Sequence, residues 1–140
     1  MIMEITRLEE IGTKHTRVLV CGSRHFDDWE LISQCLYEVY KDAPEKDGEV
    51  DFTIIEGGAK GADFLARVWA KHKMLNWIEF PADWKQYGVR AGPIRNKQMI
   101  DEGKPDLVIA FLAPNSRGTK DMIAQAQKAG IETKVIDIGV

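Results

Sequence analysis

Short runs of apolar residues alternate along the chain with longer segments in which apolar residues recur at helical spacing. The short runs predict five β-strands, over residues 17–21, 52–55, 76–80, 107–112 and 134–138. Strands connected through helices form right-handed crossovers, so they run parallel and carry helices on both faces of the sheet. The pattern therefore predicts a Rossmann-like, three-layer α/β/α fold with a five-stranded, mainly parallel sheet in the strand order 3-2-1-4-5.

The helical segments differ in how clearly they are marked. The helix after the first strand is expected to begin at Asp27, because Glu30 follows three residues later as in a capping box. Residues 41–51 mix charges with Pro44 and Gly48, which favours a solvated connector. In the helix after the second strand, a stripe typical of a core-facing surface is formed by Phe64, Leu65, Val68 and Trp69.

Length and composition limit the possible functions. The chain has 140 residues, 44% of them hydrophobic, which suits one domain and is too short for two. We divide it into an N-terminal extension, residues 1–16, and a domain covering residues 17–140. The net charge of -3 gives no general attraction for a polyanion, so a positive site has to be built locally.

The cysteines and the lack of long apolar runs bear on the compartment of the protein and on metal binding. Cys21 and Cys35 lie fourteen positions apart with no accompanying Cys/His cluster, so neither a disulfide framework nor a metal site is expected. The first sixteen residues lack the apolar run of a secretory signal, and no later stretch is long and apolar enough to cross a membrane. We therefore expect a cytoplasmic protein with no membrane partner, no bound metal and no cofactor.

Three loops that follow predicted strands combine glycine with basic residues, over residues 22–24, 57–63 and 115–119. In an open parallel sheet, ligands bind outside the carboxyl ends of the strands. Glycine lets the backbone approach a ligand closely, and helix N-termini attract anions such as phosphate. Arg24, Lys60 and Arg117 lie in these loops, and Arg95 opens the third helix. Any one loop is equally well explained as a tight turn, but together they predict a phosphate site.

Neither the P-loop pattern nor the G-x-G-x-x-G fingerprint occurs in the chain. The side chain of Trp84 is a candidate for stacking on a base, although core packing would explain it equally well. The candidate ligand-binding residues are Gly22, Ser23, Arg24, Gly57, Gly58, Ala59, Lys60, Gly61, Asp63, Trp84, Arg95, Asn96, Ser116, Arg117, Gly118 and Thr119.

Five motifs in this chain resemble the SLOG superfamily, and in particular its YspA-like branch. They are V-C-G-S-R at 20–24, E-G-G-A-K-G-A-D at 56–63, P-A-D-W at 81–84, A-G-P-I-R-N-K-Q-M at 91–99 and S-R-G-T-K-D at 116–121. The resemblance extends over most of the chain from Arg17 onward. It implies a Rossmann-like fold whose loops hold nucleotides or nucleotide-derived ligands, often in a homodimer or larger homo-oligomer.

The same superfamily includes LONELY GUY-like hydrolases, which cleave the N-glycosidic bond of a nucleoside monophosphate. The resemblance places Arg95 on the Arg of their M-x-x-R-K-x-x-M pattern. Their P-G-G-x-G-T-x-x-E pattern is broken here, because Asn115 and Ser116 replace two glycines and Met122 stands at the catalytic Glu position. Methionine cannot exchange protons. With Arg95, the catalytic candidates are therefore the acids Asp121, Glu56 and Asp63.

The sequence leaves three functional hypotheses. The first is a binding module, acting as a sensor or a sequestering protein for a nucleotide-like small molecule. The second uses the same pocket to hydrolyse a nucleotide N-glycosidic bond. The third is single-stranded DNA binding as in DprA-like relatives, for which this acidic chain lacks a broad positive surface. We expect a nucleotide-like ligand and further copies of this chain as partners, and no nucleic acid.

Overall fold

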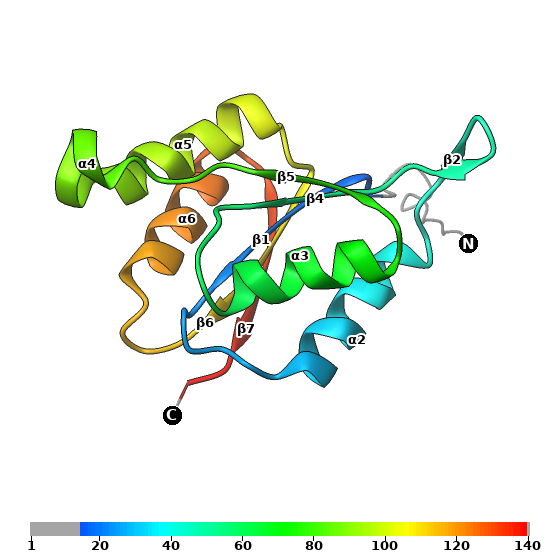
Figure 1. Cartoon of the computed structure of the whole chain (residues 1–140), viewed down its shortest axis with the longest axis horizontal. Helices are drawn as coiled ribbons and strands as arrows, with labels where there is room; N and C mark the ends of the chain where they lie inside the picture. The colour runs from blue at the N-terminus through cyan, green and yellow to red at the C-terminus, as the bar shows by residue number, and fades with distance from the viewer. Residues whose placement is uncertain (1–14, 140) are drawn as a thin grey trace, which may run out of the picture.

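A parallel β-sheet lies between two pairs of helices in the computed structural model, which describes residues 15–139 (Figure 1). The sheet has five strands in the order β5-β4-β1-β6-β7, and every neighbouring pair is parallel. The strands are β1 (Arg17–Gly22), β4 (Thr53–Glu56), β5 (Asn76–Glu79), β6 (Leu107–Leu112) and β7 (Glu132–Asp137). Numbered along the chain, these strands stand in the order 3-2-1-4-5. The predicted fold class and strand order are confirmed.

Helices cover both faces of the sheet (Figure 1). Helices α2 (Trp29–Tyr40) and α3 (Ala62–His72) pack on one face, and α5 (Ala91–Gly103) and α6 (Arg117–Lys128) pack on the other. The alternation of side chains along β1 separates the two cores, since Val18 and Val20 face α2 and α3, whereas Leu19 and Cys21 face α5 and α6. The central strands are therefore apolar on both sides, as parallel sheets require.

Helix α3 differs from the stripe that its hydrophobic residues predict. Its buried residues are Ala62, Asp63, Ala66, Trp69 and Ala70, whereas Phe64 is 47% exposed. Alanines let the helix approach the sheet closely, and Trp69 fills the space that remains. The predicted stripe is therefore confirmed at Leu65 and Trp69, which pack in this core, and is wrong at Phe64, because small alanines form most of the buried face.

The start of α2 also differs from its prediction, and the solvated connector contains a hairpin that was not predicted. The N-cap of α2 is Asp28, whose carboxylate accepts a hydrogen bond from the Leu31 N–H, and not Asp27. The connector over residues 41–51 contains a small antiparallel hairpin of β2 (Glu45–Lys46) and β3 (Glu49–Val50). Gly48 and Asp47 both have positive φ, which is the backbone conformation of a tight hairpin turn.

Beyond β5, the chain forms the short helix α4 (Trp84–Tyr87) and the 3₁₀ turn η1 (Gly88–Arg90) before α5 begins. Within residues 15–139, no helix has the length and apolarity to cross a membrane. The predicted N-terminal extension lies outside the described residues except for His15 and Thr16. Thr16 already belongs to the fold, because its N–H and hydroxyl both donate to Asp106.

Candidate functional site

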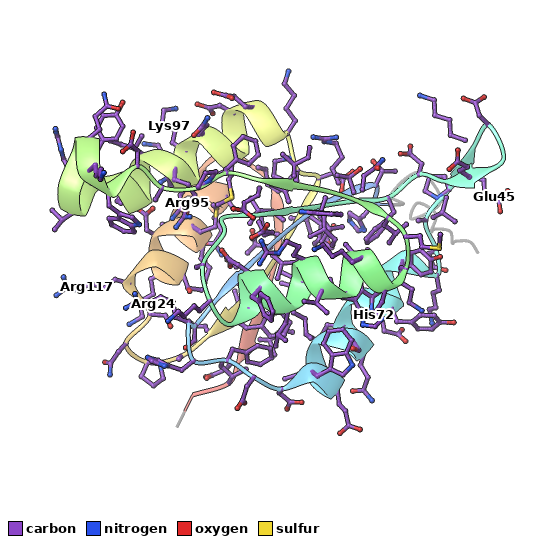
Figure 2. All side chains as sticks on the ribbon, in the orientation of Figure 1. Arg24, Glu45, His72, Arg95, Lys97 and Arg117 are labelled. Carbon is purple, nitrogen blue, oxygen red and sulfur yellow. The ribbon has the colours of Figure 1, made fainter. Side chains whose placement is uncertain are left out.

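Two adjoining cavities lie at the carboxyl edge of the sheet. The turn cavity, of about 600 Å³, lies beside the glycine-rich turn after β4, and the helix cavity, of about 730 Å³, extends to the start of α6. Both are lined by Arg24, His25, Ala59, Trp84 and Arg95. Figure 2 shows Arg24, Arg95 and Arg117 at one end of the molecule, with Glu45 at the other. The loops that are separate in sequence therefore meet at one site.

All but one of the sixteen candidate ligand-binding residues line one of these two cavities. The exception is Gly61, which has a positive φ of 76° and lies against the backbone of Ser23 and Arg24. A Cβ atom there would overlap that backbone. Gly61 thus holds the loop after β4 against the loop after β1, which shapes the site from outside it. Whether the lining residues contact a ligand stays a prediction.

The candidate acids divide into two groups. Asp63 lines the helix cavity. Asp121 lies outside the lining of both cavities, where its Oδ2 accepts hydrogen bonds from Asn96 (2.9 Å) and Gln125 (2.8 Å). Glu56 is fully buried beneath the glycine-rich turn. Met122, at the position where the related hydrolases have glutamate, is fully buried in the core between α6 and the sheet.

The glycine-rich turn, residues Gly57–Ala59, is stabilised by the buried carboxyl groups of Asp63 and Glu56. The N–H groups of Gly57 and Ala59 donate to Asp63 Oδ2 at 3.0 and 3.2 Å, and the N–H of Gly58 donates to Glu56 Oε1 at 2.6 Å. The structure therefore differs from the expectation that this turn offers its amides to a phosphate. Its three N–H groups are already hydrogen-bonded inside the protein.

Arg95 closes the turn from the side of α5. Its Nη1 donates to the Gly57 carbonyl at 2.5 Å, and its Nε donates to Asn96 Oδ1 at 3.1 Å. A Cβ atom on Gly57 would collide with this guanidinium group, so glycine is required for the contact. Arg95 thus reaches the site that the sequence predicts, but part of its hydrogen-bonding capacity fixes the shape of the turn.

Burial raises the pKa of both carboxyl groups under the turn. For Asp63 the pKa rises to about 6, with hydrogen bonds from Ala59 and Gly57 and the charge of Arg95 opposing the rise. For Glu56 the pKa rises to about 8, because it is desolvated and the charges of Asp63 and Glu79 add to the effect. At neutral pH, Glu56 is therefore mainly protonated while Asp63 is mainly ionised.

The start of α6 provides the groups that remain open to an anion. Ser116 is the N-cap, but its side chain makes no capping hydrogen bond. The Arg117 N–H donates to the Asn115 carbonyl at 3.1 Å, whereas the N–H groups of Gly118 and Thr119 have no hydrogen-bond partner within residues 15–139, as is usual in the first turn of a helix. Thr119 lines the helix cavity and is only 4% exposed. Its hydroxyl makes no hydrogen bond to any residue in the range 15–139. The ion pairs within residues 15–139 do not include Arg24, Lys60 or Arg117.

Trp84 lines both cavities and is 59% exposed, so it is not a core residue. Asp83 holds it in place as the N-cap of α4, accepting a hydrogen bond from the Gln86 N–H at 3.1 Å. Pro81 and Ala82 complete an apolar wall beside it in the turn cavity. This wall suits a flat, weakly polar group such as a nucleobase.

Sequence reasoning missed several residues that line the site. His25 lines both cavities, and Cys21 and Met99 line the helix cavity from the sheet and α5. A sequence signal existed for each of them, since His25 follows Arg24, Cys21 precedes Gly22, and Met99 ends the motif over residues 91–99. Among residues 15–139, no cluster of three His, Cys, Asp or Glu side chains has the arrangement to hold a metal ion.

Comparisons with known proteins agree with this architecture. A model of the YspA, cpYpsA-related SLOG family matches residues 16–87. The Gene 61 protein of Mycobacterium phage D29 is 34% identical over 128 residues, which cover 88% of this chain and 96% of the phage protein. The solved structure of DNA processing protein A (DprA) from Streptococcus pneumoniae aligns with a TM-score of 0.65 at 17% identity, over 89% of this chain. The aligned part is about half, 51%, of the DprA chain.

Proposed function

Because this chain belongs to the YspA, cpYpsA-related SLOG family, we propose that it is a binding module for a phosphorylated nucleotide or nucleotide-derived molecule. The family and the fold support a nucleotide-related binding module at this general level. The single observation that carries the specific proposal is the combined lining of the two adjoining cavities, where Arg24, Arg95 and Arg117 come from three separate parts of the chain and lie with the exposed Trp84.

The chemistry of the two cavities supports one orientation of such a ligand. The helix cavity contains the start of α6 together with Arg24 and Arg117, which suits a phosphate group. The amides of the glycine-rich turn are occupied by carboxyl groups, so an anion gains little there. The turn cavity, with Trp84 and its apolar wall, suits the base. We therefore place the phosphate at α6 and the base at Trp84.

Calorimetric titration with adenosine 5′-monophosphate and with adenosine tests this proposal. The monophosphate is expected to bind, and adenosine is expected to bind at least tenfold more weakly, because charge-assisted hydrogen bonds contribute about 1.5–3 kcal/mol. Guanosine and cytidine monophosphates serve as further probes of the base. If no phosphorylated probe binds or raises the melting temperature, the proposed function is wrong.

The variant Arg117→Ala is expected to weaken monophosphate binding by about 10- to 100-fold without lowering the melting temperature. Arg117 is exposed, so its loss removes a cation from the site and no packing from the core. Lys128→Ala is a matched control, since Lys128 is an exposed cation at the other end of the same helix. Equal loss of binding in both variants would indicate a general charge effect instead of a phosphate contact.

Hydrolysis of the N-glycosidic bond is the second candidate, and the position of Asp63 favours it. Among the candidate acids, Asp63 alone lines a cavity together with Arg95, and a pKa of about 6 suits proton transfer near neutral pH. We expect free base to appear on incubation with nucleoside monophosphates if this reaction occurs, and Asp63→Asn to stop it. Chromatography that finds no base above a protein-free control would exclude the reaction for the nucleotides tested.

A further inference from the structure

More acidic than basic side chains surround the glycine-rich turn. Three carboxyl groups approach it: Glu56 from the end of β4, Asp63 from α3 and Glu79 from β5. The Oε2 atom of Glu79 lies 2.8 Å from the place where a Cβ atom of Gly58 would be. Two guanidinium groups face them, Arg67 from α3 and Arg95 from α5. Three full negative charges would therefore leave one without a cation.

The contacts identify which carboxyl group lacks a partner. Glu79 forms an ion pair with Arg67 at 2.8 Å. Asp63 accepts two backbone N–H groups and experiences the charge of Arg95. Glu56 accepts only the Gly58 N–H, and among residues 15–139 its fully buried Oε2 has no hydrogen-bond partner. A buried charge without a partner costs far more than a buried neutral acid.

We propose that Glu56 is a positioning residue that holds the glycine-rich turn in its cavity-lining shape as a neutral carboxylic acid, so that ionisation of Glu56 opens the turn and weakens ligand binding. One oxygen of the acid keeps the turn folded by accepting the Gly58 N–H. The proton resides on Oε2, the oxygen without a partner. This proposal rests on the proposed function only for its effect on the ligand, and the effect on the turn is independent of it.

The direction of the pH dependence follows from the same groups. Burial and the nearby Asp63 and Glu79 raise the pKa of Glu56 from 4.5 to about 8, while hydrogen bonding by Gly58 and the charge of Arg67 oppose the rise. Because the folded pKa lies above the unfolded one, the stabilising contribution is fully present below pH 4.5 and is lost as the pH rises through 8. Buried Cys21 also lies near Asp63 and Arg95, and burial raises the pKa of its thiol, so Cys21 remains neutral over this range.

Direct titration tests the proposal without any ligand. In carbon-13 spectra of the wild-type protein, the side-chain carboxyl carbon of Glu56 is expected to titrate near pH 8. Over the same range, exchange of the Gly57, Gly58 and Ala59 amide protons, corrected for the intrinsic effect of pH, is expected to accelerate. Titration of Glu56 near pH 4.5, or turn amides whose protection does not change between pH 7 and 9, would overturn the proposal.

A matched pair of variants tests the consequence for the site. Glu56→Gln keeps an acceptor for the Gly58 N–H and cannot ionise, so its turn amides should stay protected up to pH 9. Glu102→Gln makes the same chemical change at an exposed position of α5 and should behave as the wild type. The wild type's affinity for adenosine 5′-monophosphate should fall about tenfold per pH unit above pH 8, and that of Glu56→Gln should not.

The two proposals fail in different ways. If the titration and the exchange behave as expected but no monophosphate binds at any pH, the role of Glu56 in the turn stands and the proposed function fails. If the monophosphate binds with the same pH profile in the wild type and Glu56→Gln, the proposed function stands and the role of Glu56 in binding is refuted.

Discussion

Replacing Gly61 by alanine is expected to lower the free energy of unfolding by about 3 kcal/mol or more. Gly61 has a φ of 76°, a conformation that costs other residues roughly 1–3 kcal/mol. The added Cβ atom would also lie 2.7 Å from the carbonyl carbon of Arg24 and 2.8 Å from its Cα atom. Backbone atoms cannot rotate away, so the two loops have to separate. Chemical denaturation of the purified variant measures the effect.

Gly130→Ala is the matched control for this prediction. Gly130 has a φ of 77°, nearly that of Gly61, but a Cβ atom there would meet no other atom within 4 Å. It should therefore cost only about 1 kcal/mol, from backbone conformation alone. The separation of the loops after β1 and β4 should also weaken binding of adenosine 5′-monophosphate. Equal destabilisation by the two variants would show that close contact of these loops contributes nothing.

Arg95→Ala is expected to destabilise the protein by about 2–4 kcal/mol in addition to weakening ligand binding. The change removes two hydrogen bonds, to the Gly57 carbonyl and to Asn96, and leaves Asp63 buried without its nearby cation. The sequence motif alone suggests a residue whose loss affects only the ligand, as expected for Arg117. The two arginines should thus behave differently in thermal unfolding, which measures stability without any ligand.

Two further variants separate charge from geometry at Arg95. Arg95→Lys keeps the cation but cannot reproduce both hydrogen bonds of the planar guanidinium group, so its stability should lie between those of the wild type and Arg95→Ala. Arg90→Ala removes an exposed arginine from the neighbouring 3₁₀ turn and should change stability by less than about 0.5 kcal/mol. A melting temperature of Arg95→Ala equal to that of the wild type would contradict a structural role for this side chain.

The architecture was predictable because it depends on patterns that are local in the chain. Strand β6, buried over residues 107–111, was predicted with its observed bounds, Leu107–Leu112, since six consecutive apolar residues have few alternatives. Boundaries were less accurate where the pattern is weak. Strand β7 begins at Glu132 rather than at residue 134, because this edge strand is largely exposed and its first residues are polar. The buried face of α3 was predicted only in part, because alanine carries little hydrophobic signal.

The gathering of the candidate residues at one edge of the sheet was predictable for a related reason. All five strands are parallel, so the loops after them lie at one edge, and glycine and arginine in those loops indicate an anion site. The sequence could not reveal how the polar groups are shared. Asp63 and Glu56 take up the turn amides, and Asp121 pairs with Asn96 and Gln125. These contacts depend on side-chain positions in three dimensions.

The sequence by itself determined the parallel sheet, the order of its strands and the edge at which the glycine and arginine loops gather. Only the tertiary structure decided which of those groups remain open to a ligand. Periodicity and loop position are properties of neighbouring residues, whereas hydrogen-bond partners and pKa values depend on burial and on groups distant in the chain. The glycine-rich turn illustrates the difference, since its residues suggest a phosphate cradle and its amides are held by two buried acids.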